Sequence, residues 1–408
     1  ANVNVDTFRH FGRLGLGAVL ASKNLKAVAV IGRKHLALPA DHRLYKKTYA
    51  EIYDRVLHTD AMKKYHELGT ASNVIPLNEL GALPSFNLRQ GFFGEADEIS
   101  GEGFAEGELT TKRACAGCQI GCIHVASYRR PFAPGYEYES TLVAYDHELI
   151  YAAGSLLGVG NRGEVLRLLE DMDLAGMDTI SCGTALAWAT EAMERGLVRP
   201  EQLGGVCLRF GDAEGYARAI ASIARRDSEL GHWLGEGEVA AARHYGGLDF
   251  VAAVGGQGIA GYWTGYGHVV GHLLGARHSH LDNAGYALDQ KLEPYTDEAL
   301  IERLVADEAE RITQTCVAIC LFARGVYDLE TISQALASVG IRRSPDELLA
   351  MGRRIYDERV RLRERLGFRV SACDVPRRFF ETPTPRGQLQ PERVANLLAL
   401  YEQKRGQT

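Results

Sequence analysis

Apolar residues recur at helical spacing over most of the chain. The first such run, YKKTYAEIYDRVLHTDAMKKYHELG, ends at Gly69. A second run, GEVLRLLEDMD, is amphipathic and breaks at the pair Ala175 and Gly176. Ser181 can then cap a further helix that ends at Gly196. A long helix is predicted over residues 297–322, so the pattern indicates a mostly helical protein.

Two regions depart from the helical pattern. Residues 12–17 form the Gly-rich turn GRLGLG, and residues 25–32, LKAVAVIG, are a β-branched apolar run typical of a buried strand. Residues 251–290 are dense in Gly, His and Tyr and are predicted to be loop. The predicted fold class is therefore α+β, mostly helical with a β remnant at the N-terminus.

Composition and charge narrow the function classes. The chain has 408 residues and a formal net charge of -6, without a basic tract, which argues against a nucleic-acid partner. No apolar run is long enough to cross a bilayer, and no signal peptide opens the chain. We therefore expect a cytoplasmic protein without a membrane span. Its eight cysteines are too sparse for a disulfide framework.

Three of the cysteines are clustered in RACAGCQIGCIH, where Cys115, Cys118 and Cys122 have the spacing Cys-x2-Cys-x3-Cys. Thiolates bind iron–sulfur clusters and zinc, and this spacing lets one loop supply three of them. Cys316 or Cys320 could supply a fourth ligand to a 4Fe–4S cluster. The alternatives are a Cys3His zinc site that includes His124 and a loop without a metal. Local spacing does not separate the cluster from zinc.

A resemblance covers residues 9–380. The motifs FGRLGLGAVLASKNLKAVAV, CAGCQIGC, GYEYES, DLAGMDTISCGTALAWATEAMERG and RLRERLGFRVSACDVPRRFFE stand in the order seen in the aldehyde:ferredoxin oxidoreductase family. These enzymes contain tungsten on a bis-pterin cofactor and a nearby 4Fe–4S cluster. The resemblance implies a domain-1 remnant over residues 1–38 and the helical domains 2 and 3 over residues 39–248 and 249–408.

The resemblance implies a set of cluster ligands. They are Cys115, Cys118, Cys122 and Cys320. The fourth cysteine of the family ends an Asp-x-x-Gly-Leu-Cys motif. In this chain Thr315 replaces the Asp and Ala318 replaces the Gly, which puts one pterin contact in doubt.

The resemblance also implies a pterin site. Asp173, Gly176 and Asp178 match the motif Asp-x-x-Gly-x-Asp, in which carboxylates accept hydrogen bonds from the pterin edge. Without the resemblance, the two carboxylates read more simply as helix-end residues. Further candidates for pterin or phosphate contacts lie along the Gly-rich segment: Arg13, Gly15 and Lys23. The metal is tungsten or molybdenum, and Mg bridging the pterin phosphates is a further candidate.

The expected catalytic residues also follow from the resemblance. Glu139, in GYEYES, matches a Glu beside the metal and is expected to act as a base. His280 is the first choice and His278 the second for the active-site histidine, which can hold the carbonyl oxygen of the substrate. Tyr262 and Tyr286 are expected to line the pocket.

The resemblance implies that the protein oxidises a small-molecule aldehyde to a carboxylic acid. Electrons would leave through the cluster to ferredoxin or to an iron–sulfur electron-transfer subunit. Two alternatives remain: a low-potential reductase subunit of the aromatic acyl-CoA type, and an electron-relay protein that holds the cluster without pterin. Family members also carry a β-rich segment before the Gly-rich turn. We expect a separate polypeptide to supply it.

Overall fold

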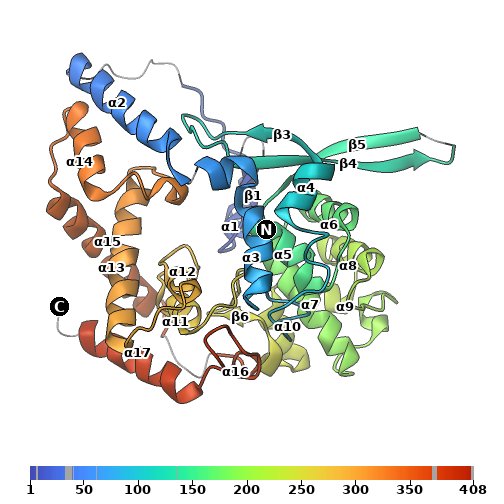
Figure 1. Cartoon of the computed structure of the whole chain (residues 1–408). Helices are drawn as coiled ribbons and strands as arrows, with labels where there is room; N and C mark the ends of the chain where they lie inside the picture. Colours follow the sequence, from blue (N-terminus) through green and yellow to red (C-terminus); the bar gives the residue numbers. More distant parts are fainter. Residues whose placement is uncertain are drawn as a thin grey trace.

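The computed structural model describes residues 1–5, 8–32, 39, 41–60, 62–135, 137–369 and 375–405. Two groups of helices lie on opposite sides of the body (Figure 1). The first group comprises α5 (His147–Ala153), α6 (Arg162–Leu174), α7 (Thr179–Glu194), α8 (Ala213–Arg225), α9 (Glu229–Gly235) and α10 (Glu238–Tyr245). The second comprises α13 (Asp297–Cys316), α14 (Leu329–Ser338), α15 (Pro345–Arg365) and α17 (Pro391–Arg405).

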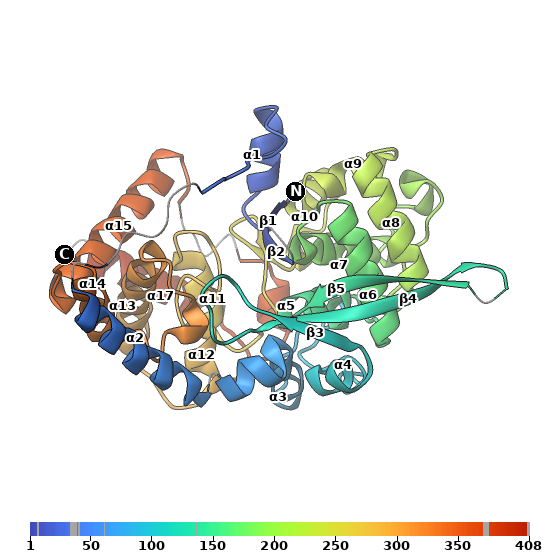
Figure 2. The same ribbon diagram turned by 90° about the horizontal axis from the view of Figure 1, so that it is seen from above.

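Shorter elements connect these groups. Helix α2 (His42–Leu57) packs against α14, whereas α1 (Leu16–Ser22) projects away from the body (Figure 2). The other helices are α3 (Val74–Glu79), α4 (Gly101–Gly107), α11 (Tyr266–Leu274), α12 (Gly285–Gln290) and α16 (Arg378–Glu381). The single turns are η1 (Met62–His66), η2 (Gly69–Asn73), η3 (Ser155–Leu157), η4 (Pro200–Leu203), η5 (Leu248–Phe250) and η6 (Leu321–Ala323).

The largest sheet is antiparallel, with the order β3 (Leu109–Arg113), β4 (Ile123–Ala133) and β5 (Glu137–Tyr145). Because β3 pairs only with residues 123–126, the far half of the β4–β5 hairpin projects from the body as two strands (Figure 1). Two smaller sheets pair β1 (Val3–Val5) with β2 (Arg9–Phe11) and β6 (Ala253–Val254) with β7 (Gln257–Gly258). The predicted α+β class with mostly helical content is confirmed.

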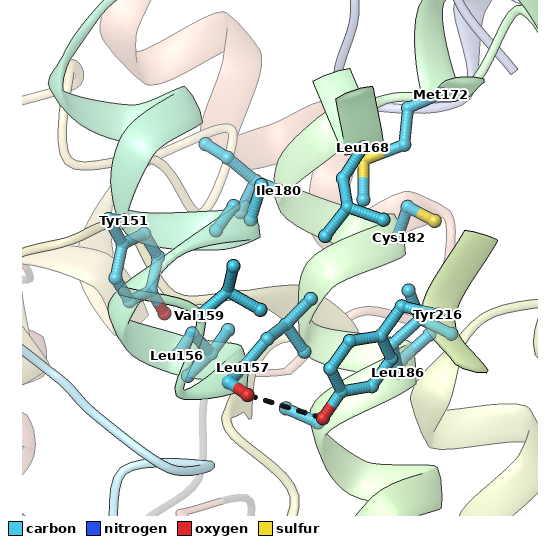
Figure 3. Packing of buried hydrophobic residues seen from close by; sticks show 14 of the residues in the cluster. Tyr151, Leu156, Leu157, Val159, Leu168, Met172, Ile180, Cys182, Leu186 and Tyr216 are labelled. Atoms are coloured by element: carbon cyan, nitrogen blue, oxygen red, sulfur yellow. Dashed lines mark hydrogen bonds between the residues drawn. The ribbon is translucent and has the colours of Figure 1, made fainter. Parts of the chain in front are cut away.

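Three hydrophobic cores hold the chain together. The largest lies among α5–α8, where the Tyr216 hydroxyl donates to the Leu157 carbonyl over 3.3 Å (Figure 3). A second core joins α11, α13, α15 and α17. The third core is small and joins α2, the cysteine loop and the segment after η6 through Ile52, Val56, Ile120 and Val326. This third core packs the segment that follows Cys320, including Phe322, against Cys118 and Cys122.

Several predicted elements are wrong. Residues 25–32 form no strand and are exposed, because no neighbouring strand among the described residues pairs with them. The region 251–290 contains α11, a helix that is buried on all sides and so shows no amphipathic period. Asp178, rather than Ser181, caps α7 by accepting from the Ser181 N–H. The predicted Gly196 stop is confirmed, with φ 72° directly after the cap of α7.

The long helix predicted over residues 297–322 ends earlier than expected. Helix α13 ends at Cys316, and Ala318 adopts a left-handed φ of 59°. The Ile319 N–H donates to the Gln314 carbonyl and the Ala318 N–H to the Thr315 carbonyl, both over 3.0 Å, which completes a Schellman motif. Cys320 therefore lies beyond the helix and does not share a helical face with Cys316.

Two further predictions concern the absence of a membrane span and a domain boundary at residue 38. Within the described ranges, no helix combines the length and the apolar character needed to cross a membrane. The predicted domain boundary at residue 38 and Tyr136 of the GYEYES motif lie outside the described residues.

Candidate functional site

A cavity of about 470 Å³ is lined by the first helical group and by segments that lie between the two groups. It receives side chains from residues 8–13, η1, the start of α5, the start of α7, α12 and η6. Segments that are far apart in the sequence therefore line one partly open cavity. Cavities of this size are typical of small-molecule sites.

Glu148 and His280 form the polar centre of this cavity. His280 Nε2 lies 3.2 Å from Glu148 Oε1, and the Tyr262 hydroxyl donates to the same oxygen over 3.1 Å. Burial acts to raise the pKa of Glu148, but the hydrogen bond and charge of His280 outweigh it and lower that pKa. Glu148 is therefore ionised at neutral pH and held by two donors.

Glu148 is positioned by the cap of α5. Asp146 is the N-cap residue, and its Oδ1 accepts from the Leu149 N–H over 3.1 Å. Burial, followed by the charge of Glu148, raises the pKa of Asp146 to about 6. Two carboxylates thus lie side by side in the cavity with different proton affinities, a pattern common at catalytic sites.

The predicted catalytic residues occupy different places. His280 lines the cavity, as do Tyr262 and Tyr286. Glu139 lies on the projecting hairpin, where it is ion-paired with Arg130, and it does not line the cavity. Glu139 lies in strand β5.

His278 also lies apart from the cavity. Its Nδ1 is 3.0 Å from the His272 carbonyl, and its ring lies 5.4 Å from that of Phe368. The structure therefore brings one of the two predicted histidines, His280, to the cavity and leaves the other among packed side chains.

The four predicted cluster ligands come together from the β3–β4 loop and from the start of η6. They are Cys115, Cys118, Cys122 and Cys320. Burial raises the pKa of Cys122 to about 11; Arg9 opposes this rise, whereas the other three thiols add to it. Burial likewise raises the pKa of Cys320, and Cys118 and Cys115 contribute. Phe322, two residues after Cys320, packs in the same small core as Cys118 and Cys122, which keeps the late cysteine near the early loop.

Local geometry shapes the cysteine loop. Gly117 and Gly121 adopt left-handed φ values of 71° and 61°, which turn the chain between successive thiols. Arg9 Nη2 donates to Cys122 Sγ over 3.6 Å. Among the residues that the structure describes, no three His, Cys, Asp or Glu side chains are close enough together to bind one metal ion. A 4Fe–4S cluster does not require that closeness, because each thiolate binds a different iron.

The Gly-rich turn and the Asp motif meet at Arg13 and Asp178, both of which line the cavity. Arg13 Nε lies 3.9 Å from Asp178 Oδ2, and Arg13 donates to the Gly258 carbonyl. The Arg13 Nε and Nη1 atoms are buried without a hydrogen-bond partner, as is Glu238 Oε1. Burial raises the pKa of Glu238 to about 7, and Arg13 is among the groups that oppose the rise.

The other predicted pterin residues are placed as follows. Asp173 lines the cavity and accepts from His10 Nε2 over 2.8 Å. Gly176, with φ 65°, accepts a backbone hydrogen bond from Asn2 over 2.8 Å. Gly15 and Lys23 flank α1, away from the cavity lining.

Comparison with known proteins assigns the family. The family model described as aldehyde ferredoxin oxidoreductase, domains 2 and 3, matches residues 47–407. The chain belongs to the aldehyde ferredoxin oxidoreductase family. This family consists of oxidoreductases, so the chain is an oxidoreductase of the same family.

Relatives of known name support the assignment. The tungsten-containing aldehyde ferredoxin oxidoreductase of Pyrococcus horikoshii is 30% identical over 423 residues, which cover 98% of this chain and 67% of that protein. The protein of the same name from Pyrococcus furiosus is 30% identical, with 99% and 67% covered. An aliphatic sulfonate oxidoreductase, WOR-like subunit, of Pyrococcus furiosus is 29% identical over 231 residues, which cover 56% of this chain and 35% of that protein.

A solved structure shares the fold. The active-site complex BamBC of benzoyl coenzyme A reductase, in complex with 1,5-dienoyl-CoA, superposes with a TM-score of 0.70. The superposition covers 97% of this chain and 67% of that chain at 18% sequence identity. At this identity the likeness shows the fold alone.

The family implies a tungsten pterin cofactor and an iron–sulfur cluster, and the residues of this chain fit both. The buried unpaired nitrogens of Arg13 and the carboxylate of Asp178, both in the cavity lining, offer donors and acceptors for a pterin edge. The soft thiolates of the four neighbouring cysteines suit iron. Cys122 lines the cavity that Arg13 and Asp178 also line, so the two groups would be neighbours.

Sequence reasoning missed Glu148, Asp146 and Glu238. Asp146 and Glu148 stand in YDHELIYAAG, where two acids precede a short apolar helix, and this local signal could have been noticed. The GYEYES motif points to Glu139 near the start of β5, whereas Asp146 and Glu148 follow the end of that strand. For Glu238 the sequence contains no signal, since its burial depends on α7 and on Arg13.

Proposed function

We propose that this protein oxidises an aldehyde to a carboxylic acid and passes the electrons to a partner through a 4Fe–4S cluster. An aldehyde and a water molecule give a carboxylic acid, two electrons and two protons. The observation that carries the proposal is that Cys122, one of the four cysteines proposed to bind the cluster, lines the same cavity as Glu148 and His280. When bound, a tungsten or molybdenum bis-pterin supplies two-electron redox chemistry at the aldehyde carbon.

The side chains of this protein hold and move the protons. Glu148, ionised at neutral pH, accepts a proton from the attacking water, and the Tyr262 hydroxyl keeps its carboxylate in place. His280 Nδ1 is buried without a partner. When both ring nitrogens carry protons, Nε2 donates to Glu148 and Nδ1 can donate to the carbonyl oxygen, where negative charge develops.

A partner chain belongs to the proposal. Large apolar side chains are exposed along residues 11–31, namely Phe11, Val19, Val28, Val30 and Ile31. An exposed apolar patch of this kind marks a protein contact. A relative named as a subunit and a neighbour solved as a complex are consistent with a multi-chain enzyme. We propose that one polypeptide covers this patch and completes the pterin site, and that ferredoxin or an iron–sulfur subunit takes the electrons.

The second candidate function is that of a low-potential reductase of aromatic acyl-CoA, in which electrons pass from the cluster to the substrate. We retain this second candidate because the chain shares its fold with a benzoyl coenzyme A reductase complex. The electron-relay alternative, which lacks pterin, is less favoured, because Arg13 in the cavity lining keeps buried nitrogens without a hydrogen-bond partner that a cofactor could use.

Metal analysis and substrate screening test the proposal. The protein, purified anaerobically with its co-purifying chains, should contain tungsten or molybdenum together with four irons per chain. It should reduce a viologen dye when an aldehyde is added. Iron without tungsten or molybdenum would indicate the electron relay. Activity with acyl-CoA and a strong reductant, but not with aldehydes, would indicate the reductase.

A further inference from the structure

A series of hydrogen bonds along the cavity joins Lys64 to Glu148, which is paired with His280 in the proposed catalytic site. Lys64 Nζ donates to Asn73 Oδ1 over 2.6 Å, and Asn73 Nδ2 donates to the Tyr262 hydroxyl over 3.5 Å. The Tyr262 hydroxyl then donates to Glu148. All four residues line the cavity. Lys64 and Glu148 therefore mark two separate positions along the lining, one cationic and one anionic.

A second cation lies near Lys64. Lys64 Nζ lies 5.7 Å from the centre of the Tyr65 ring, and Arg324 hydrogen-bonds the hydroxyl of the same tyrosine, so the two cations flank one side chain of the cavity lining. Arg324 contacts the Tyr65 hydroxyl and donates to the Leu321 carbonyl. Within the described ranges, neither cation forms an ion pair with a carboxylate. Lys64 is exposed and Arg324 is half-buried, and both line the cavity, so an anionic group in the cavity would meet two cations without a carboxylate partner.

Two pairs of aromatic rings line the cavity as well. Tyr65 stacks on Phe322 with ring centroids 4.3 Å apart, and Tyr262 lies 4.5 Å from Tyr286. Burial raises the pKa of the Tyr65 hydroxyl, and the neighbouring Arg324 opposes this rise. Flat aromatic faces of this kind bind planar rings.

From these contacts we propose that the substrate is an aromatic aldehyde that carries a carboxylate, with the carboxylate bound by Lys64 and Arg324 and the formyl group at Glu148 and His280. This inference rests on the proposed function, which it makes more specific. The carboxylate neutralises the cation pair through charge-assisted hydrogen bonds. The aromatic ring packs against the two ring pairs. A neutral aliphatic aldehyde would form neither the charge-assisted hydrogen bonds nor the ring contacts.

Binding of the product tests the proposal without turnover. Isothermal titration of the purified holoenzyme complex with terephthalate, the product of 4-carboxybenzaldehyde, should give binding at least about tenfold tighter than with monomethyl terephthalate, which lacks one charge. Lys64→Gln and Arg324→Gln should each weaken terephthalate binding about tenfold. Lys63→Gln, at an exposed neighbouring position outside the cavity lining, should leave it unchanged. Equal binding of the diacid and its monoester would overturn the proposal.

Turnover separates this inference from the proposed function. With 4-carboxybenzaldehyde, kcat/KM should exceed that with benzaldehyde by about tenfold, and Lys64→Gln should abolish the difference by raising KM. If both aldehydes are oxidised equally well, the carboxylate site is wrong and aldehyde oxidation stands. If neither is oxidised but terephthalate binds through Lys64 and Arg324, the oxidation is wrong and the anion site stands.

The cations could instead hold a phosphate of the cofactor. Tungsten and pterin content therefore has to be measured in both variants. Full metal and pterin content in Lys64→Gln and Arg324→Gln, together with weakened terephthalate binding, supports the substrate site. Loss of pterin from these variants would assign the cations to the cofactor and overturn the proposal.

Discussion

Glu148 Oε1 lies 3.2 Å from His280 Nε2, and the two residues come from different halves of the chain. Glu148 is in the first turn of α5, after the three-stranded sheet, whereas His280 follows α11. Their contact joins the first helical group to the segment between α11 and α12, inside the cavity that Cys122 also lines. The predictions below test this arrangement and the fold that supports it.

The catalytic carboxylate can be identified by a pair of substitutions. Glu148→Gln should lower kcat for aldehyde oxidation by about 10²- to 10⁴-fold, because it removes a base within reach of the substrate. Glu139→Gln should change kcat little, since Glu139 is paired with Arg130 on the projecting hairpin. Steady-state kinetics of the two variants decide between the carboxylates. A large loss in Glu139→Gln alone would favour the motif-based assignment.

The fourth cluster ligand is tested at two cysteines that lie four residues apart. Cys320→Ser should lose the cluster, because Cys320 lies beside the other three thiols. Cys316→Ser should keep it, because Cys316 is the last residue of α13 and is separated from Cys320 by the left-handed turn at Ala318. Iron and sulfide analysis with electron paramagnetic resonance of the reduced protein gives the answer. A cluster retained in Cys320→Ser and lost in Cys316→Ser would reverse the assignment.

The end of α13 offers a stability test. Ala318→Gly should stabilise the protein by about 1 kcal/mol, because glycine adopts the left-handed φ of 59° without the cost that alanine incurs. The same substitution at Ala50, an exposed site inside α2, should destabilise the protein by about 1 kcal/mol. Urea unfolding of both variants measures the difference. Destabilisation at both sites would show that Ala318 is not left-handed.

The pH dependence of stability should contain a contribution from Glu238. Burial raises its pKa to about 7 in the folded protein, against about 4.3 when unfolded. The contribution of Glu238 to the free energy of unfolding is fully present below about pH 4. It is lost as the pH rises through about 7, because the carboxyl of the folded protein must then ionise in a buried place. The loss is on the order of 3 kcal/mol.

Glu238→Gln should flatten this slope, since an amide does not titrate. Urea unfolding between pH 5 and pH 8 measures it. Glu236→Gln serves as the control, because Glu236 is exposed and paired with Arg226. If Glu238→Gln keeps the slope of the unsubstituted protein, Glu238 is ionised throughout this range.

A buried ion pair connects the C-terminal segment to α7. Arg378 Nη2 lies 2.5 Å from Glu191 Oε1, and both side chains are almost fully buried. Glu191→Gln should destabilise the protein by about 3 kcal/mol, because it leaves the Arg378 charge buried with little compensation. Glu194→Gln, one turn later and partly exposed, should cost less than about 1 kcal/mol. Thermal unfolding compares the two, and equal effects would contradict the structure.

Much of the fold could be predicted from local pattern. The buried face of α6 follows from its apolar spacing, and the end of α7 at Gly196 follows from a glycine that accepts a left-handed φ. Both signals lie within one or two helical turns. The cysteine spacing and the order of the family motifs likewise needed no knowledge of contacts. Each of these features depends on neighbours in the sequence, so the sequence displays it directly.

Tertiary structure decided the composition of the cavity. Strand pairing opposite Arg130 places Glu139 on the hairpin, while the cap of α5 directs Glu148 toward His280. The left-handed turn at Ala318 ends α13 and brings Cys320 to the early thiols. These outcomes depend on contacts between segments that lie far apart in the chain. Such contacts form only when the hydrophobic cores pack, and no local period or spacing records which remote side chains they bring together.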